Sequence, residues 1–260
     1  MPELIEIEYY RRLAEGALGR VVDGVDAPDP WFLKRGLTAD IVRDALLGRQ
    51  FVCARRIGKL LPLDMDDGAV LGLRFGMTGR LVLDDRAGVD DLQYASRRRE
   101  AAWDRFTVRF DDGGSLRIND ARRLGGVELD PDEARLGADA ASITPAQLTA
   151  ALDHSTAPLK ARLMDQHRVA GLGNLLVDEV LWRAGLDPAR PAGALDAAER
   201  RRLHRHLRRT VDDLLTRGGS HLGRLQAARV RGGHCPRDGA ELQRRTVGGR
   251  TTYSCPVHQR

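Results

Sequence analysis

The apolar residues change their period near the middle of the chain, and this change constrains the fold more than any other sequence feature. Before residue 130, short apolar runs alternate with turns such as Asp66-Asp67-Gly68 and Asp111-Asp112-Gly113. We expect residues 1–130 to form a two-layer antiparallel β-sandwich with helices at its margins. The predicted strands are Phe51–Ile57, Lys59–Leu63, Val70–Phe75, Arg80–Leu83, Phe106–Phe110 and Ser115–Ile118.

After a polar stretch at residues 84–100 and a linker at residues 131–143, the pattern becomes helical. Thr144-Pro145 is typical of a helix start, and Asp196 with Glu199 resembles a capping box. The fold class is therefore α+β, with a helical domain at residues 144–220 and a β-hairpin ribbon at residues 221–260. The predicted helices are Glu3–Leu18, Pro145–Leu152, Pro158–Arg168, Asn174–Ala184 and Asp196–Thr216.

Positive charge is concentrated in residues 201–260, which contain 14 Arg against 4 Asp or Glu in a chain of net charge +5. Such a segment is suited to a polyanion, although a solvated basic tail would have the same composition. The three cysteines, an odd number, argue against a secreted disulfide protein, and no apolar run reaches the length of a membrane span. We expect a cytoplasmic protein.

The first residues place an amine beside carboxylates. Removal of the initiator methionine would leave Pro2 with a free secondary amine, which can condense with an aldehyde to give an iminium. The positive end of a helix would favour the uncharged amine, and the neighbouring Glu3 could transfer protons. Taken alone, Pro2 is more often a helix-starting proline, and Glu3 a surface residue that complements the helix dipole.

A glycine-rich turn, Gly171-Leu172-Gly173, precedes Asn174 at the start of a predicted helix. Exposed backbone N–H groups at such a junction can bind phosphate, and the Asn side chain adds a donor. The simpler interpretation is an ordinary helix N-cap. Further along, Gly248-Gly249 favours a tight hairpin that would project Arg250 at its tip, where it could contact phosphate.

The C-terminal segment has two metal-ligand half-sites. Cys235 and Asp238 are separated by two residues, as are Cys255 and His258, and 16 residues lie between the half-sites. This spacing resembles a zinc ribbon, in which carboxylate is the rarer structural ligand. His234 could replace Asp238, and a ribbon without metal is the alternative.

These motifs together resemble the formamidopyrimidine-DNA glycosylase / endonuclease VIII family of bifunctional DNA glycosylases. The resemblance spans essentially the whole chain in the family's order. The segments that carry it are Pro2-Glu3-Leu4-Ile5-Glu6-Ile7-Glu8, Arg55-Arg56-Ile57-Gly58-Lys59, Phe75-Gly76-Met77-Thr78-Gly79, Asn119-Asp120-Ala121-Arg122-Arg123-Leu124-Gly125, Asp165 to Asn174 with Asp178-Glu179, and Gly249-Arg250-Thr251-Thr252 to Cys255-Pro256.

The resemblance implies a role for each matching residue. Pro2 would attack C1′ of the damaged nucleotide and Glu3 would serve as acid/base, while Lys59 would contact phosphate at the lesion. Asn174 and Arg250 would hold the flanking phosphates, and the space left by the flipped base would be filled by Met77, Arg122 and Leu124. The partner would be damaged double-stranded DNA, bound by a monomer through a helix–two-turn–helix domain. Catalysis would need no cofactor, and zinc would be structural.

The chain departs from the family at several positions. Ile5 stands where the family usually has Pro, and Leu124 replaces the commoner Phe. The segment from Gly218 to His234 is short, which weakens an assignment to 8-oxoguanine and leaves the excised base open. Two other classes of function compete with a glycosylase. A non-catalytic binder of damaged DNA would not need Pro2 and Glu3, and an RNA-binding protein would leave the N-terminal motif unexplained.

Overall fold

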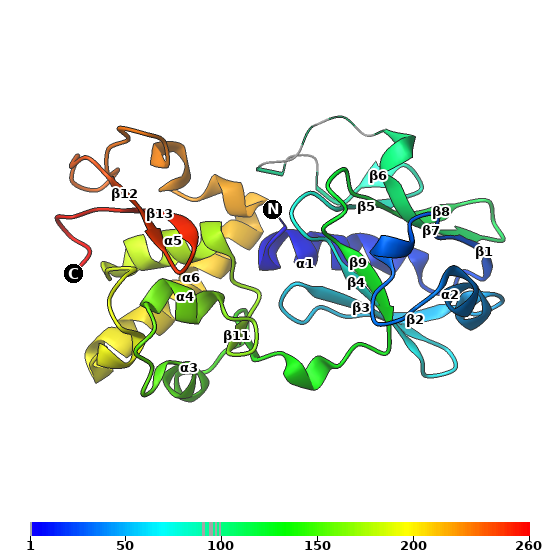
Figure 1. The fold of residues 1–260 in the computed structure, drawn as a ribbon, viewed down its shortest axis with the longest axis horizontal. Coiled ribbons are helices and arrows are strands. Elements are labelled where there is room, and N and C mark those ends of the chain that lie inside the picture. The colour runs from blue at the N-terminus through cyan, green and yellow to red at the C-terminus, as the bar shows by residue number, and fades with distance from the viewer. Residues whose placement is uncertain (1, 90–91, 94–95, 97, 99) are drawn as a thin grey trace. The chain divides into compact units, whose positions relative to one another are not determined.

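The computed structural model describes residues 2–89, 92, 93, 96, 98 and 100–260. The chain forms two compact units (Figure 1). The first contains residue 2 and Glu6–Glu133, and the second contains Glu3–Ile5 together with Ala134–Arg260. None of the described helices has both the length and the apolar character needed to cross a bilayer. The division of the second unit at residue 220 stays a prediction.

Two antiparallel sheets build the first unit, as the alternating pattern predicts. One sheet has the strand order β1-β7-β8-β5-β6 and the other β2-β3-β4-β9. Their buried faces contribute to one apolar core, to which Tyr10 and Phe75 add rings whose centres lie 4.6 Å apart. The strands are β1 (Val22–Asp26), β2 (Phe51–Ala54), β3 (Leu60–Met65), β4 (Val70–Arg74), β5 (Arg80–Leu83), β6 (Arg86–Ala87), β7 (Asp104–Phe110), β8 (Ser115–Asn119) and β9 (Gly126–Leu129).

Three elements of this unit were not predicted from the sequence. Strand β1 contains Asp and Gly, which strands disfavour, but it forms because it pairs with β7. Strand β9 forms by pairing with β4. Helix α2 (Ala39–Leu46) follows the N-cap Thr38, whose side chain accepts a hydrogen bond from the N–H of Ile41. In the segment predicted as a loop at residues 84–100, Arg86–Ala87 form β6, and Arg97 and Arg99 lie outside the described residues.

The first helix is shorter than predicted. Helix α1 spans Leu4–Ala14 and is followed by a 3₁₀ turn at Glu15–Ala17. Pro2 therefore precedes the helix by two residues and does not occupy its first turn. This weakens the argument that the dipole of α1 favours an uncharged amine, because that effect acts only within the terminal turn.

Helices build most of the second unit. The two predicted N-caps are confirmed, because Thr144 with Gln147 and Asp196 with Glu199 form complete capping boxes. The helix Asn174–Ala184 ends at Gly185, which has the left-handed conformation. The helix predicted at Pro158–Arg168 is shorter and ends at Met164. It ends there because the side chain of Asp165 accepts a hydrogen bond from the N–H of His167 and so opens a turn. The elements are α3 (Pro145–Leu152), α4 (Leu159–Met164), α5 (Asn174–Ala184), α6 (Ala197–Arg217), the short parallel pair β10 (Ala138–Asp139) and β11 (Val169–Ala170), and the hairpin β12 (Gln243–Val247) and β13 (Arg250–Ser254).

Candidate active site and metal centre

Glu3 is fully buried and lies at the N-terminus of α5. Its Oε1 accepts a hydrogen bond from the N–H of Leu175 at 2.9 Å, and its Oε2 accepts from Gly173 and Leu176, each at 3.0 Å. Helix N-termini leave N–H groups without intrahelical partners, and a carboxylate satisfies them well. The interpretation of Glu3 as a surface residue of its own helix is therefore wrong: it complements the dipole of a helix about 170 residues further along the chain.

This contact also changes the interpretation of the glycine-rich turn. The N–H groups of Gly173, Leu175 and Leu176, which could have bound phosphate, donate to Glu3 instead. Asn174 is the first residue of α5 and is half-buried. Among the described residues, its Oδ1 atom has no hydrogen-bond partner. Three N–H groups of this turn are thus already occupied, whereas the Asn174 side chain has an oxygen acceptor without a partner among the described residues.

The approach of Glu3 requires glycine at position 173. A Cβ atom at Gly173 would lie 2.3 Å from the Glu3 carboxyl carbon, closer than non-bonded atoms can approach. Pro2 is buried, as is Ile5, which is fully inaccessible to solvent. The departure from the family at position 5 therefore places a buried aliphatic side chain two residues after Glu3.

In the first unit, Lys59 lies in the two-residue turn between β2 and β3, closed by a bridge between Ile57 and Leu60. Lys59 is half-buried. The base of this hairpin is held by ion pairs from Arg55 to Asp64 and Glu133, with N–O distances of 2.6 and 2.8 Å. A hairpin anchored in this way restricts where its tip can move, and so positions Lys59.

Asp120 joins the two loops that carry Met77, Arg122 and Leu124. It is fully buried, and its Oδ1 accepts from the Thr78 hydroxyl at 2.5 Å, while its Oδ2 accepts from the N–H groups of Leu124 and Gly125, each at 2.9 Å. Met77 is half-buried and Arg122 is exposed. Leu124 is 51% exposed, so its side chain is available to a ligand. Sequence reasoning quoted Asp120 within a motif but assigned it no role.

The predicted hairpin around Arg250 is confirmed. Val247 pairs with Arg250, and the intervening Gly248 and Gly249 have φ values of 56° and 72°, as a tight hairpin turn requires. Arg250 is exposed at the start of β13. Its guanidinium is therefore presented to solvent from the end of a two-stranded ribbon.

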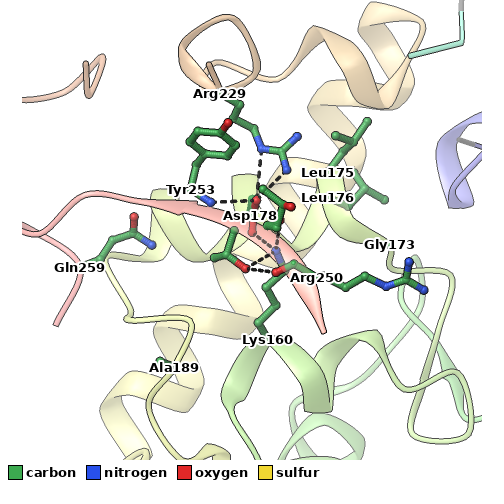
Figure 2. Close-up of polar contacts among 12 residues, drawn as sticks. Lys160, Gly173, Leu175, Leu176, Asp178, Ala189, Arg229, Arg250, Tyr253 and Gln259 are labelled. Carbon is green, nitrogen blue, oxygen red and sulfur yellow. Dashed lines mark hydrogen bonds and ion pairs between the residues drawn. The ribbon is translucent and has the colours of Figure 1, made fainter. Parts of the chain in front are cut away.

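A buried ion cluster fixes this ribbon to α4 and α5, and sequence reasoning missed it. Lys160 is fully buried, and its Nζ lies 2.7 Å from Oδ1 of Asp178 and 2.8 Å from the hydroxyl of Thr252. Figure 2 shows Asp178 between Lys160 and Arg229, with dashed contacts to both; the contact to Arg229 is 2.8 Å. Burial lowers the pKa of Lys160, and Asp178 opposes that shift. Lys160 thereby holds the residues that follow Arg250.

The four predicted metal ligands converge. One donor atom from each of Cys235, Asp238, Cys255 and His258 lies within 4.8 Å of all the others. The His258 Nδ1 atom is 2.7 Å from Asp238 and 3.7 Å from the Cys235 sulfur. Tetrahedral zinc, with bonds of about 2.0–2.3 Å, needs ligand atoms about 3.3–3.8 Å apart, so small adjustments would accommodate the ion. His234, the alternative ligand, lies outside this group, and its backbone forms an isolated antiparallel bridge with that of Glu241.

Trp182 at the end of α5 supports the metal-ligand group. Its indole N–H donates to the Cys235 sulfur at 3.3 Å, and its carbonyl oxygen lies 3.2 Å from Nε2 of His258. A second contact of this kind fixes the orientation of a ligating imidazole. Burial raises the pKa of the Cys255 thiol, and a bound cation would favour the thiolate again. The residues therefore fit a metal ion.

Comparison with known proteins agrees with the fold. Residues 1–127 match the model of the formamidopyrimidine-DNA glycosylase N-terminal domain, and residues 136–224 match that of the H2TH domain of the same family. The chain is 36% identical to formamidopyrimidine-DNA glycosylase of Paracoccus denitrificans, with both chains covered over their full length. It is 32% identical to the enzyme of Chloroflexus aggregans, with 100% and 98% of the two chains covered.

Solved structures show the same likeness. The Lactococcus lactis Fpg protein in complex with abasic-site DNA aligns with a TM-score of 0.83 and 27% identity, and 99% of each chain is covered. The complex of that protein with N7-benzyl-Fapy-dG DNA gives the same TM-score at 28% identity. Fold and site thus define a DNA-repair enzyme with a β-sandwich and an H2TH domain. The chain belongs to the formamidopyrimidine-DNA glycosylase family.

Proposed function

We propose that Pro2, freed by removal of Met1, is the nucleophile of this base-excision DNA glycosylase and AP lyase. The amine attacks C1′ of a flipped, damaged nucleotide, the glycosidic bond breaks, and the base leaves with a proton. The C1′–O4′ bond then opens as a proton is delivered to O4′, and the nitrogen lone pair forms the C=N bond of an iminium. The resulting iminium acidifies C2′, so that loss of a C2′ proton expels the 3′-phosphate; a second elimination can release the sugar. A base inside the duplex is out of reach, so the nucleotide must first leave the stack.

The buried carboxylate of Glu3 is the observation that carries this proposal. Three backbone N–H groups hold it in place, and it is covalently adjacent to Pro2. Both of its oxygens accept, as those of an ionised carboxylate do. A positioned carboxylate can take up the proton that the Pro2 amine loses on attack and deliver it to O4′ as the sugar opens. It can then accept another proton when C2′ is deprotonated. A surface glutamate would lack this fixed orientation.

The remaining site residues are proposed to bind DNA. Lys59 at a hairpin tip, the amide of Asn174 and the exposed Arg250 offer donors to phosphates. Met77 and Leu124 would wedge into the base stack while Arg122 pairs with the unpaired base, and Asp120 would keep their loops together. The excised base stays open, because the segment from Gly218 to His234 is short and packs on α5 through bonds to Glu179.

We infer that the metal of the C-terminal ribbon is zinc, held by Cys235, Asp238, Cys255 and His258. Two thiolates, an imidazole and a carboxylate form a closed four-ligand set, which is typical of a structural ion. Purified protein should contain about one zinc per chain by mass spectrometry of the metals. Asp238→Ala should lower that content, whereas His234→Ala should not; the reverse result would reassign the ligand.

Borohydride trapping on abasic-site duplex tests the central proposal. The native chain should form a covalent adduct, and Pro2→Gly should reduce trapping at least about 100-fold. A removable N-terminal extension supplies the matched control: adduct should be absent while the extension is retained and should appear once cleavage exposes Pro2. Tight binding of abasic-site DNA without trapping would favour the non-catalytic binder. A panel of duplexes with single lesions would then identify the base.

Monomeric state and a cytoplasmic, nucleoid-associated location are also proposed. Light scattering of the free chain and of its complex with one duplex tests the first. Cell fractionation tests the second.

A further inference from the structure

Basic side chains gather at the C-terminal end of α5, at the opposite end of this helix from Asn174. Two neighbouring pockets, of about 450 and 460 Å³, share Arg183, His206 and Arg237 in their walls. The first also contains Arg209 and Arg224, and the second Arg202. We call these six residues the α6 basic face. In the described part of the chain, no Asp or Glu lines either pocket.

The charges of the α6 basic face are only partly neutralised. Arg183 is anchored by Glu179 at 2.6 Å and Asp213 at 2.7 Å. By contrast, the side chains of Arg209 and Arg224 are exposed and form no ion pair with any described carboxylate. Burial lowers the pKa of His206, and four arginines lower it further; these are Arg205, Arg209, Arg237 and Arg183. The arginine contributions to this shift show that several cations lie near the imidazole.

Arg237 is held in place by its neighbours. Its guanidinium lies 5.2 Å from the centre of the Trp182 ring and donates to the carbonyl of Arg183 at 3.2 Å. Trp182 is itself fixed by its bond to Cys235. This part of the α6 basic face is therefore preorganised, which reduces the entropy lost when a ligand binds.

The spacing of the cations favours a chain of phosphates over one isolated anion. Arg202, His206 and Arg209 lie on one side of α6, at intervals of four and three residues, and span about 10 Å along its axis. Guanidinium groups match phosphate oxygens with two parallel hydrogen bonds. Asn174 and Arg183 lie at opposite ends of α5, about 14 Å apart along the helix, so this end of the α6 basic face is separate from Asn174.

We propose that the α6 basic face binds the phosphate backbone of a second DNA duplex, while the lesion site holds the first. Contacts to phosphate alone carry no sequence information, so this binding would be independent of damage. An enzyme that holds two segments at once could pass from one to the other without entering bulk solution. The phosphate chemistry, and not a base or a lesion, would determine recognition.

The test uses full-length enzyme whose lesion site is occupied permanently by borohydride-trapped duplex. A fluorescent undamaged duplex is then titrated onto this complex and followed by anisotropy. The unmodified complex should bind it, and Arg209→Gln/Arg224→Gln should weaken binding roughly fivefold or more and reduce the slope of log affinity against log salt by about two. Trapping by this variant should stay within about twofold of the parent.

The matched control is Arg201→Gln/Arg208→Gln, which removes two charges from α6 without altering either pocket wall. It should bind the second duplex within about twofold of the parent. Equal loss in both variants, or no binding by the trapped complex, would overturn the proposal. Tighter binding of polyglutamate than of duplex would assign the surface to an acidic protein, and full competition by millimolar inorganic phosphate would reduce it to a single anion site. The proposal rests on the proposed chemistry of Pro2, and failure to form the trapped adduct would contradict that chemistry and not the second binding surface.

Discussion

The two ends of α5 carry partial charges of opposite sign, and side chains of opposite charge lie near each end. At the N-terminus, one buried carboxylate from Glu3 accepts three backbone N–H groups. At the C-terminus, Arg183 and Arg237 bring positive charge, and Trp182 contacts the metal-ligand group. Both arrangements complement the helix dipole. The N-terminal arrangement is buried and depends on the single carboxylate of Glu3. The C-terminal arrangement is open to solvent and contains several arginine side chains, so that the loss of one leaves the others in place.

The comparison predicts unequal sensitivity to mutation. A closed site with one carboxylate cannot compensate for its loss, whereas an open site with several cations can. The most severe variants should therefore affect the N-terminal end of α5, those in the middle of the helix should affect the ribbon, and those at the C-terminal end should be mild.

Glu3→Gln should have the largest effect. The variant loses the proton-transferring group and exposes three helix N–H donors to an amide, so single-turnover base excision should fall about 100-fold or more. Cleavage of a preformed abasic site should fall less, because no base has to leave and the amine can condense with the open-chain aldehyde that is in equilibrium with the closed sugar. Glu3→Asp keeps the charge and serves as the control. Base excision by Glu3→Gln at the parental rate would remove Glu3 from the mechanism.

Lys160→Met should have the next largest effect, because it breaks a buried ion pair in the middle of the molecule's second unit. The free energy of unfolding should fall by about 3 kcal/mol in urea titrations, since Asp178 keeps Arg229 but loses one of its two cations. At a temperature where the variant is folded, KM for DNA should rise more than kcat falls, because Arg250 is less well positioned. Lys160→Arg would show whether charge alone suffices; unchanged KM in Lys160→Met would separate the cluster from DNA binding.

Gly173→Ala should disturb the N-terminal end of α5 without removing any polar group. The new methyl group would collide with the Glu3 carboxyl carbon, which must then shift at a cost of roughly 1–3 kcal/mol. Thermal unfolding measures the stability, and base excision should fall together with it. Gly223→Ala is a useful comparison, because its Cβ would instead press on the carboxylate of Glu179. A fully stable and active Gly173→Ala would mean that the Glu3 contact is loose.

Asp213→Asn tests the C-terminal end and should have the smallest effect. Burial tends to raise the pKa of Asp213, but hydrogen bonds from Arg183 and Arg217 hold it below its ordinary value. A lowered pKa in the folded state adds stability above the ordinary pKa, near 3.9, and that stability is lost as pH falls through the folded-state value. The melting temperature of the variant should be lower by roughly 1–3 °C at pH 7, and the difference should shrink as the pH falls below the ordinary pKa and through the folded-state value. A difference that persists in acid would indicate lost packing instead.

Much of the fold could be predicted because its signals are local. The strand turns, the capping residues Thr144 and Asp196, and the Gly248-Gly249 hairpin each act within a few residues. Strand β1 and strand β9 could not be predicted in the same way, because their stability comes from pairing with distant strands. The metal-ligand group was accessible because two short half-sites have a characteristic spacing.

The sequence by itself determined the α+β organisation, the family, and the identities of the residues proposed for catalysis and metal binding. Only the tertiary structure decided how charges are buried: Glu3 at the start of α5, Asp120 between two loops, and Lys160 against Asp178. The physical reason is that a buried charge is stable only beside partners that satisfy it. The partners of Glu3 and Lys160 are distant in the sequence and leave no periodic pattern in it. Asp120 differs, because two of its partners, Leu124 and Gly125, follow it closely in the chain.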